Sequence, residues 1–207
     1  MPKLATSGTR LAQVTERIRS DVLFGAFEPG AWLKLIDLQE RYGATQFEVR
    51  QALAALRAQR LVEHRVNHGF RVAVPDAVER DQLYFVRTAL ERSAAPLVVA
   101  NAGDDDVVAL QALAADFDRS VASEGRQRQA AANSAFHDRF FAISGNPVLV
   151  ETIETMRERS HFATTGRWRT EAGLRASGAE HHAMIEAIRL RDAAMLDRIV
   201  VAHIAAF

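Results

Sequence analysis

The chain has 207 residues, enough for one large domain or two modest ones. Its 48% hydrophobic and 25% charged residues are typical of an ordinary soluble globular protein. The absence of cysteine excludes disulfide bonds and thiolate metal ligands. The first residues, MPKLATSGTR, lack the apolar core of a secretory signal, and no stretch is long enough to span a bilayer. We therefore expect a cytoplasmic protein without a membrane partner.

The net charge of zero hides an uneven distribution along the chain. Residues 1–75 contain 11 Lys and Arg against 7 Asp and Glu, and the remaining 132 residues contain 15 against 19. A basic first part followed by an acidic second part indicates two modules, the first of which faces a polyanion.

The basic module begins with three predicted helices. Apolar residues at helical spacing predict the first helix over 10–25, and "LIDLQERYG" predicts a short second helix that ends at Gly43. Between them, "FEPGAWL" is typical of a turn built on Pro29 and Gly30. The third helix follows at once in "ATQFEVRQALAALRAQR", where Thr45 and Glu48 form a capping box at its start.

A β-hairpin follows the third helix. Alternating apolar residues flank an Asn-His-Gly turn in "LVEHRVNHGFRVAV". Three helices and a hairpin, with a tight link between the second and third helices, predict a winged helix-turn-helix DNA-binding domain over residues 1–75. The alternative is a small α+β domain with no role in DNA binding.

The third helix has the character of a recognition helix. Its buried face is predicted to consist of Val49, Ala52, Leu53 and Leu56. The opposite face centres on Phe47 and Arg50, with Gln46 at its edge. In a DNA major groove, an apolar side chain packs on a thymine methyl, arginine binds guanine or phosphate, and glutamine binds adenine. Alternatively, Phe47 packs on the linker or on the second module.

From residue 79 onward the pattern is helical without any strand signal. We predict an antiparallel all-helical bundle over 79–207, so that the fold as a whole is mainly α. The predicted helices span residues 79–101, 104–123, 127–144, 147–165, 170–190 and 192–206.

Three of the seven histidines lie on apolar stripes of three different predicted helices, namely His137, His181 and His203. Asn133 precedes His137 by four residues and therefore shares its helix face. A single inward histidine is usually a core residue, but three of them converging with Asn133 in a bundle could ligate a transition metal. The spacing alone leaves both interpretations open.

Arg87 is a further inward polar residue, because it lies on the apolar stripe of residues 83–97. A buried arginine needs an anion. That anion is either an acidic residue of the bundle, such as Glu91 one turn later, or the carboxylate of a ligand.

The two modules resemble domains of known families. Residues 10–74 resemble the DNA-binding domain of the GntR family of bacterial transcription regulators, through "PGAWL", "LQERYGATQFEVRQALAAL" and "LVEHRVNHGFRV". The family usually shows Gly-Val-Ser-Arg-Thr-Pro-Val-Arg-x-Ala-Leu at residues 43–53, and here Gln46 replaces the usual arginine while Phe47-Glu48 replaces Thr-Pro. This departure from the family pattern leaves the fold prediction intact, but it means that the usual operator sequence of the family is not implied.

For this domain we predict that Gln46 and Arg50 contact base edges and that Phe47 contacts a thymine methyl. His68 and Gly69 are predicted to bring the wing tip to the minor groove, and Arg65 and Arg71 to contact phosphates. The predicted DNA-binding residues are Thr45, Gln46, Phe47, Arg50, Arg65, His68, Gly69 and Arg71.

Residues 79–207 resemble the FCD effector domain of the FadR-like branch, through "VRTALERSAAPL", "FHDRFFAISGNPVL", "EHHAMIEAIRLRD" and His203. Many members bind a divalent metal through an Asp-x-x-x-His pair and two further histidines. The resemblance places these ligands at Asn133, His137, His181 and His203, and for three neutral imidazoles we predict zinc or nickel. Asparagine supplies a neutral oxygen where the family has aspartate, which predicts weaker binding.

The resemblance also implies a small organic or sugar acid as effector, and this favours a ligand carboxylate as the partner of Arg87. We therefore expect a homodimeric regulator that binds double-stranded operator DNA and is not an enzyme. One alternative is a metal-dependent hydrolase that uses the three histidines, and another is a metabolite-binding module. The hydrolase needs a general base, and Glu180 is expected to point elsewhere, because adjacent helical residues diverge by about 100°.

Overall fold

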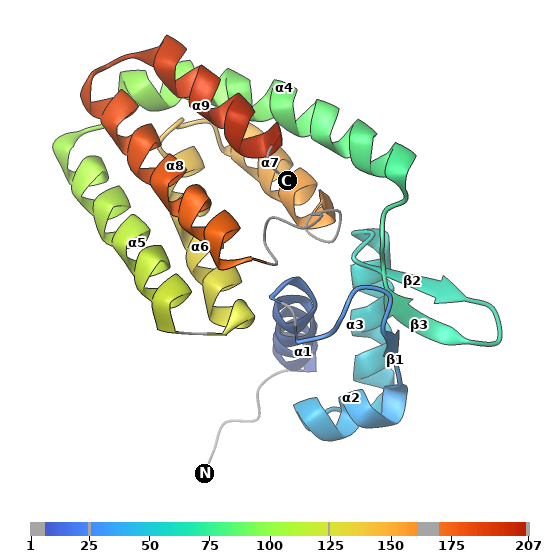
Figure 1. The fold of residues 1–207 in the computed structure, drawn as a ribbon. Coiled ribbons are helices and arrows are strands. Elements are labelled where there is room, and N and C mark those ends of the chain that lie inside the picture. The colour runs from blue at the N-terminus through green and yellow to red at the C-terminus, as the bar shows by residue number, and fades with distance from the viewer. Residues whose placement is uncertain (1–6, 25, 124, 161–169, 206–207) are drawn as a thin grey trace. The chain divides into compact units, whose positions relative to one another are not determined.

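The structure is a computed structural model of the chain, and it describes residues 7–24, 26–123, 125–160 and 170–205. The chain divides into two compact units, Met1–Val74 and Pro75–Phe207. Figure 1 shows the helices and strands of both units.

The first unit is a winged helix-turn-helix, as predicted. Its elements are α1 (Ser7–Leu23), β1 (Trp32–Leu33), α2 (Leu35–Tyr42), α3 (Gln46–Ala58), β2 (Val62–Arg65) and β3 (Gly69–Val72). The side chains of Ile18, Leu38 and Leu53, one from each helix, are almost completely buried. Three amphipathic helices therefore close one small core, and the hairpin extends from it.

Local chemistry sets the tight link between α2 and α3. Gly43 ends α2 in the left-handed conformation, with φ of 60°, and its N–H donates to the carbonyl of Gln39. Two residues later Thr45 caps α3 by accepting a hydrogen bond from the N–H of Glu48, whose carboxylate accepts one from the N–H of Thr45. The predicted capping box is confirmed.

The sheet has one strand more than the sequence indicated. Trp32 and Leu33, predicted to lie in a turn, form β1 and pair antiparallel with Arg71 and Phe70 of β3. The strand order is β1-β3-β2, so β3 is central and the hairpin is joined to the segment that leads into α2. The prediction of a two-stranded wing was incomplete because β1 is defined by pairing with residues that are distant in the sequence.

The second unit is an all-helical bundle, as predicted (Figure 1). Its helices are α4 (Ala77–Asn101), α5 (Asp104–Ser123), α6 (Arg126–Ala142), α7 (Pro147–Ser160), α8 (Glu171–Arg189) and α9 (Ala193–Ala205). The predicted continuations into residues 161–165 and 206 lie outside the described residues. In Figure 1, α5 lies beside α6 and α8, and α9 lies along α4.

The core of the bundle is apolar on most of its length but contains a polar centre. Phe136, Phe140, Phe141, Ile153 and Met184 are nearly fully buried. Charged and polar side chains are buried as well, including those of Arg87, Glu91, His137, His181 and His203. Buried polar groups are costly unless they are paired, so this polar centre is a candidate ligand site. No helix in the described part of the chain is both long and apolar enough to cross a membrane.

Candidate functional site

The exposed face of α3 carries the predicted recognition residues. Val49, Ala52, Leu53 and Leu56 are buried, as predicted. Gln46, Phe47 and Arg50 are exposed, and the Phe47 side chain has a relative exposure of 68%. Thr45 is also exposed, but its hydroxyl is bonded to Glu48 in the capping box. Gln46, Phe47 and Arg50 are therefore exposed on one face of α3, where they could contact bases.

The two wing arginines are paired within the wing itself. Glu63 lies opposite Arg71 in the register of β2 and β3 and forms an ion pair with it. The same carboxylate is 3.0 Å from the guanidinium of Arg65. Glu63 was not predicted to take part. A hairpin aligned about its Asn-His-Gly turn would have placed Arg65 opposite Arg71, whereas the observed register pairs Arg65 with Gly69 and Glu63 with Arg71. A phosphate contact by either arginine would compete with this carboxylate.

The wing tip has a defined shape. Asn67 and Gly69 both have positive φ, of 63° and 91°. Between them, His68 is 3.0 Å from the carbonyl oxygen of Val66 through Nδ1, and its ring stacks on Trp32 at a centroid distance of 5.7 Å. The tip predicted to approach DNA is thus tied to β1.

The three histidines predicted on apolar stripes meet in the centre of the bundle. His137 comes from α6, His181 from α8 and His203 from α9, and each side chain is about 1% exposed or less. The Nε2 atom of His137 is 3.3 Å from that of His181 and 3.2 Å from that of His203. One nitrogen from each of the three rings lies within 4.8 Å of the others.

The surroundings keep these rings neutral. Burial lowers the pKa of His137 and His181 well below the usual range, and burial also lowers that of His203. The positive charge of Arg157 adds to the effect at all three rings. Neutral imidazole is the form that ligates metals, because the lone pair is then available.

Glu180 supports one ring of the cluster from the side. Its carboxylate oxygen is 2.7 Å from the Nδ1 of His203. A carboxylate at Nδ1 places the hydrogen there and leaves a lone pair on Nε2, which faces the other histidines. The expectation that Glu180 points elsewhere was wrong. The divergence of about 100° separates it from His181 on its own helix, but α9 brings His203 to it.

Asn133 is half-buried on α6, one turn before His137. Its Oδ1 atom is buried and accepts no hydrogen bond from the residues that the structure describes. The Nδ1 atoms of His137 and His181 are likewise buried without a described partner. An amide oxygen that is buried and unsatisfied has a lone pair to spare for a metal or for bound water.

Arg87 is buried and has partners in the bundle. Its Nε donates to Glu91 at 2.9 Å, and its Nη1 donates to the hydroxyl of Ser160 at the end of α7. Glu91, one of the two partners that the sequence left open, is therefore bonded to Arg87.

A second arginine, Arg157 on α7, shares the same carboxylate less closely. Its Nη1 is 3.7 Å from Glu91, too far for a hydrogen bond, and has no hydrogen-bond acceptor within the described residues. Burial lowers the pKa of Arg157 to about 10, and its guanidinium lies 5.7 Å from the centre of the Phe141 ring. Two guanidiniums thus share the buried carboxylate of Glu91, while Asp138 and Glu154 add negative charge near Arg157. Arg157 was not predicted from the sequence, because it stands in the polar segment "RERS".

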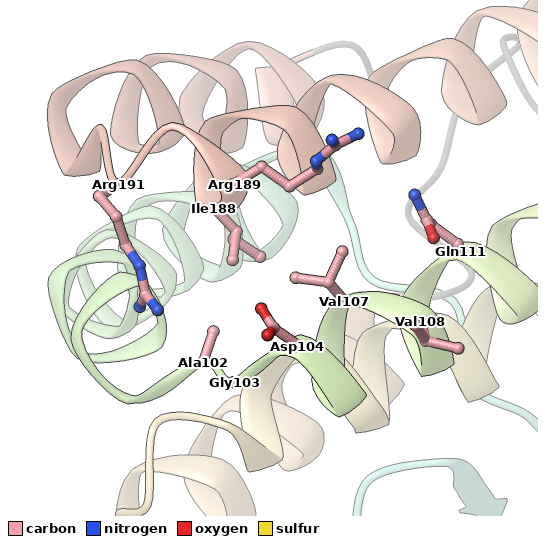
Figure 2. A pocket seen from close by; sticks show the side chains of 9 residues that line it. All are labelled: Ala102, Gly103, Asp104, Val107, Val108, Gln111, Ile188, Arg189 and Arg191. Atoms are coloured by element: carbon pink, nitrogen blue, oxygen red, sulfur yellow. The ribbon is translucent and has the colours of Figure 1, made fainter.

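A surface pocket lies elsewhere on the bundle. Figure 2 shows this pocket of about 360 Å³, whose described lining residues are Ala102, Gly103, Asp104, Val107, Val108, Gln111, Ile188, Arg189 and Arg191. It includes none of the histidines, nor Asn133, Arg87 or Arg157. It is an open depression at the start of α5, distinct from the polar centre.

Comparison with known proteins identifies the chain. Residues 82–206 match the family described as "FCD domain", and residues 11–72 match "Bacterial regulatory proteins, gntR family". The chain is a GntR-family transcription regulator with an FCD domain. GntR-family regulators bind operator DNA through the helix-turn-helix and a small-molecule effector through the FCD domain, and FCD domains often bind a metal.

Relatives span nearly the whole chain. The HTH-type transcriptional regulator YdhC of Bacillus subtilis is 23% identical over 92% of this chain and 86% of its own length. The Nta operon transcriptional regulator of Aminobacter aminovorans is 27% identical, over 86% and 83%. Escherichia coli McbR/YncC has the same fold, with a TM-score of 0.84 and 23% identity over 95% of this chain and 93% of that structure. These are transcriptional regulators and not enzymes, so the hydrolase alternative is rejected.

Proposed function

We propose that this GntR regulator binds a pseudo-palindromic operator as a homodimer and that a small carboxylate effector changes its operator affinity from the polar centre of the FCD domain. The observation that carries this proposal is the buried histidine cluster beside Arg157, whose Nη1 is buried without a hydrogen-bond acceptor among the described residues. A carboxylate is the ligand that both features would accept.

A divalent metal, zinc or nickel, fits the histidine cluster. Ligand nitrogens at 2.0–2.1 Å from a tetrahedral zinc ion lie about 3.3 Å apart, close to the Nε2 distances of 3.2 and 3.3 Å around His137. Without a cation, the three Nε2 atoms cannot all be satisfied by hydrogen bonds to one another. The Nε2 of His137 has either one hydrogen or one lone pair, so it satisfies only one of its two neighbours. A cation is compatible with lone pairs on all three.

Asn133 is proposed as a weak fourth ligand or as a hydrogen-bond partner of bound water. Its unsatisfied oxygen supports this role, and its lack of charge predicts a weaker site than aspartate would give. When bound, the metal supplies coordination positions that a carboxylate oxygen can occupy.

The effector carboxylate is proposed to meet the arginines at the same centre. Arg157 supports this because its Nη1 has no acceptor within the described residues, although it is buried. Arg87 shares the carboxylate of Glu91 with Arg157 and is hydrogen-bonded to it. Asp138 and Glu154 also add negative charge near Arg157, but its Nη1 atom has no hydrogen-bond acceptor among the described residues. An incoming carboxylate would accept a hydrogen bond from this atom, and planar guanidiniums are well suited to binding it.

For DNA recognition we propose the contacts that the exposed face of α3 allows. Gln46 contacts adenine, Arg50 contacts guanine or phosphate, and Phe47 contacts a thymine methyl. The exposure of all three supports this. His68 and Gly69 at the wing tip approach the minor groove. Effector binding then shifts the population between arrangements of the dimer that bind DNA well and poorly.

Selection of bound DNA from a random pool tests the regulatory part directly. We expect an enriched sequence made of two inverted half-sites. A pool that yields no enriched sequence would contradict operator recognition.

Once the operator is known, titrations with and without a panel of small organic and sugar acids test the effector. Arg157→Met should abolish the response while leaving unliganded operator affinity within about twofold. Arg87→Met should remove the response as well but lower stability, since it strands Glu91. A response that survives Arg157→Met would refute the assignment of that side chain.

A further inference from the structure

One face of α4 presents a large apolar side chain without a described partner. Phe85 is 78% exposed, whereas buried residues of the same helix, such as Leu83 and Ala94, face the core. A phenyl ring held in water is unfavourable, because burying it would remove apolar surface from solvent. Exposed aromatic residues of this kind are common at protein interfaces.

Directly beside Phe85 lies a depression of about 460 Å³. Its described lining residues are Asp81, Tyr84, Phe85, Thr88, Ala89 and Arg92 from α4 and Ile204 and Ala205 from α9. Tyr84, Phe85, Ala89 and Ile204 give this lining an apolar part. The same patch of surface therefore contains both a protruding phenyl ring and a hollow that could receive one.

We propose that this face pairs with itself: α4 of one copy packs antiparallel on α4 of a second copy, and each Phe85 enters the depression of the other. The proposal rests on the homodimer of the proposed function and names its interface. A twofold contact uses the same patch on both subunits, so that patch must be complementary to itself. A ring next to a hollow meets this condition.

The charges of α4 agree with the same register. In a pair of antiparallel helices, the residue number of one helix increases where that of the facing helix decreases. If Phe85 lies opposite the partner's Thr88, then Asp81, four residues earlier, lies opposite the partner's Arg92, four residues later. Both side chains are available, since Asp81 is 73% exposed and Arg92 is 53% exposed.

Neither charge is isolated within its own chain. Arg92 is 2.7 Å from Asp197, and Asp81 is 3.3 Å from Arg80. In the pair of helices these would form two neutral four-residue groups, each with two arginines and two aspartates. Opposite charges placed across an interface set its register and orientation. A partner of unrelated sequence would have to supply both the ring and the charges, whereas a second copy of this chain has them.

Sedimentation velocity over a range of protein concentrations tests the interface. Wild-type protein should be a dimer, and Phe85→Lys should raise the dimer dissociation constant at least a hundredfold, since every dimer contains the change twice. Val108→Lys, on the surface of α5 with a similarly exposed side chain at 64%, is the matched control and should change it less than threefold. Circular dichroism of each variant establishes that it is folded.

Charge reversal separates pairing from a general loss of stability. Asp81→Arg places like charges opposite each other and should weaken the dimer at least tenfold. Adding Arg92→Asp restores opposite charges in the proposed register and should return the constant to within threefold of wild type. A wild-type monomer, a Phe85→Lys dimer of normal strength, or a double variant as weak as the single one would each overturn the proposal. DNA selection with wild-type protein is independent of these results, so failure of the interface and failure of the regulatory function are distinguished.

Discussion

Replacing Glu180 by glutamine would test the metal site from outside its ligands. The carboxylate is 2.7 Å from the Nδ1 of His203, and 24% of its side chain is exposed. Glutamine has the same size and retains an oxygen that can accept the hydrogen bond, but it has no charge. The change therefore leaves the three ligating rings in place while removing the negative charge that favours a lone pair on the Nε2 of His203.

The size of the effect follows from this geometry. Losing such a supporting carboxylate usually lowers metal affinity by about 10- to 100-fold. Because Glu180 is partly exposed, water screens its charge, and we expect the lower end, about tenfold or ~1.4 kcal/mol. At a metal concentration of about 100 times the wild-type dissociation constant, stabilisation should fall from ~2.7 to ~1.4 kcal/mol. For a chain of this length the melting temperature should drop by roughly 3–5 °C.

Metal-stripped protein, titrated with zinc or nickel against a chromophoric chelator, gives the affinity. Glu171→Gln is the matched control, since Glu171 is on the same helix, is 66% exposed and pairs with Arg175 instead. Affinities of Glu180→Gln and wild type within twofold of each other would refute the supporting role. Wild-type protein that binds neither metal would refute the metal site itself.

Three further predictions concern pH, the operator and Asn133. Burial lowers the pKa of all three clustered histidines, so in metal-free protein the unfolded chain binds protons below pH ~6.5 that the folded chain does not. The contribution of these histidines to stability is then fully present above pH ~6.5 and is lost as pH falls, by up to ~4 kcal/mol per pH unit. Urea unfolding at several pH values measures this slope, and a slope of zero below pH ~6.5 would contradict it. Gln46→Arg should shift the selected operator from adenine toward guanine at one position per half-site, and an unchanged motif would exclude that contact. Asn133→Asp should tighten metal binding at least tenfold in the chelator titration, because it adds an anionic oxygen; an unchanged affinity would place Asn133 outside the coordination sphere.

Helix periodicity made most of the fold predictable. The bounds of α4, α5, α6 and α8 and the starts of α7 and α9 agree with the predicted ranges to within a few residues, because each helix buries one continuous apolar stripe. The capping box at Thr45 fixed the start of α3 in the same way. In contrast, Trp32 and Leu33 have no local pattern of a strand, and their conformation depends on Phe70 and Arg71 nearly forty residues later.

In the site, too, residues placed by the pattern of their own helix were predictable, and residues placed by contacts between helices were not. His137, His181 and His203 were recognisable as inward residues because each lies on its own apolar stripe, and the structure brings them together. Glu180 was expected to point away from the site because it diverges from His181 on its own helix, and Arg157 was missed because it occupies a polar stretch of sequence. Each reaches the centre only through a neighbouring helix, and no periodicity within one helix records which side chains a neighbour will bring close.

The short strand β1 has a mechanical consequence. It joins the segment before α2 to the central strand of the wing, and Trp32 of β1 stacks on His68 at the wing tip. The parts expected in the major groove and in the minor groove are therefore linked by backbone hydrogen bonds as well as by the core. A signal from the effector has little freedom to tilt the recognition helix while leaving the wing in place. We expect effector binding to alter the separation and orientation of the two DNA-binding domains of the dimer on the duplex. Each domain should keep its own conformation.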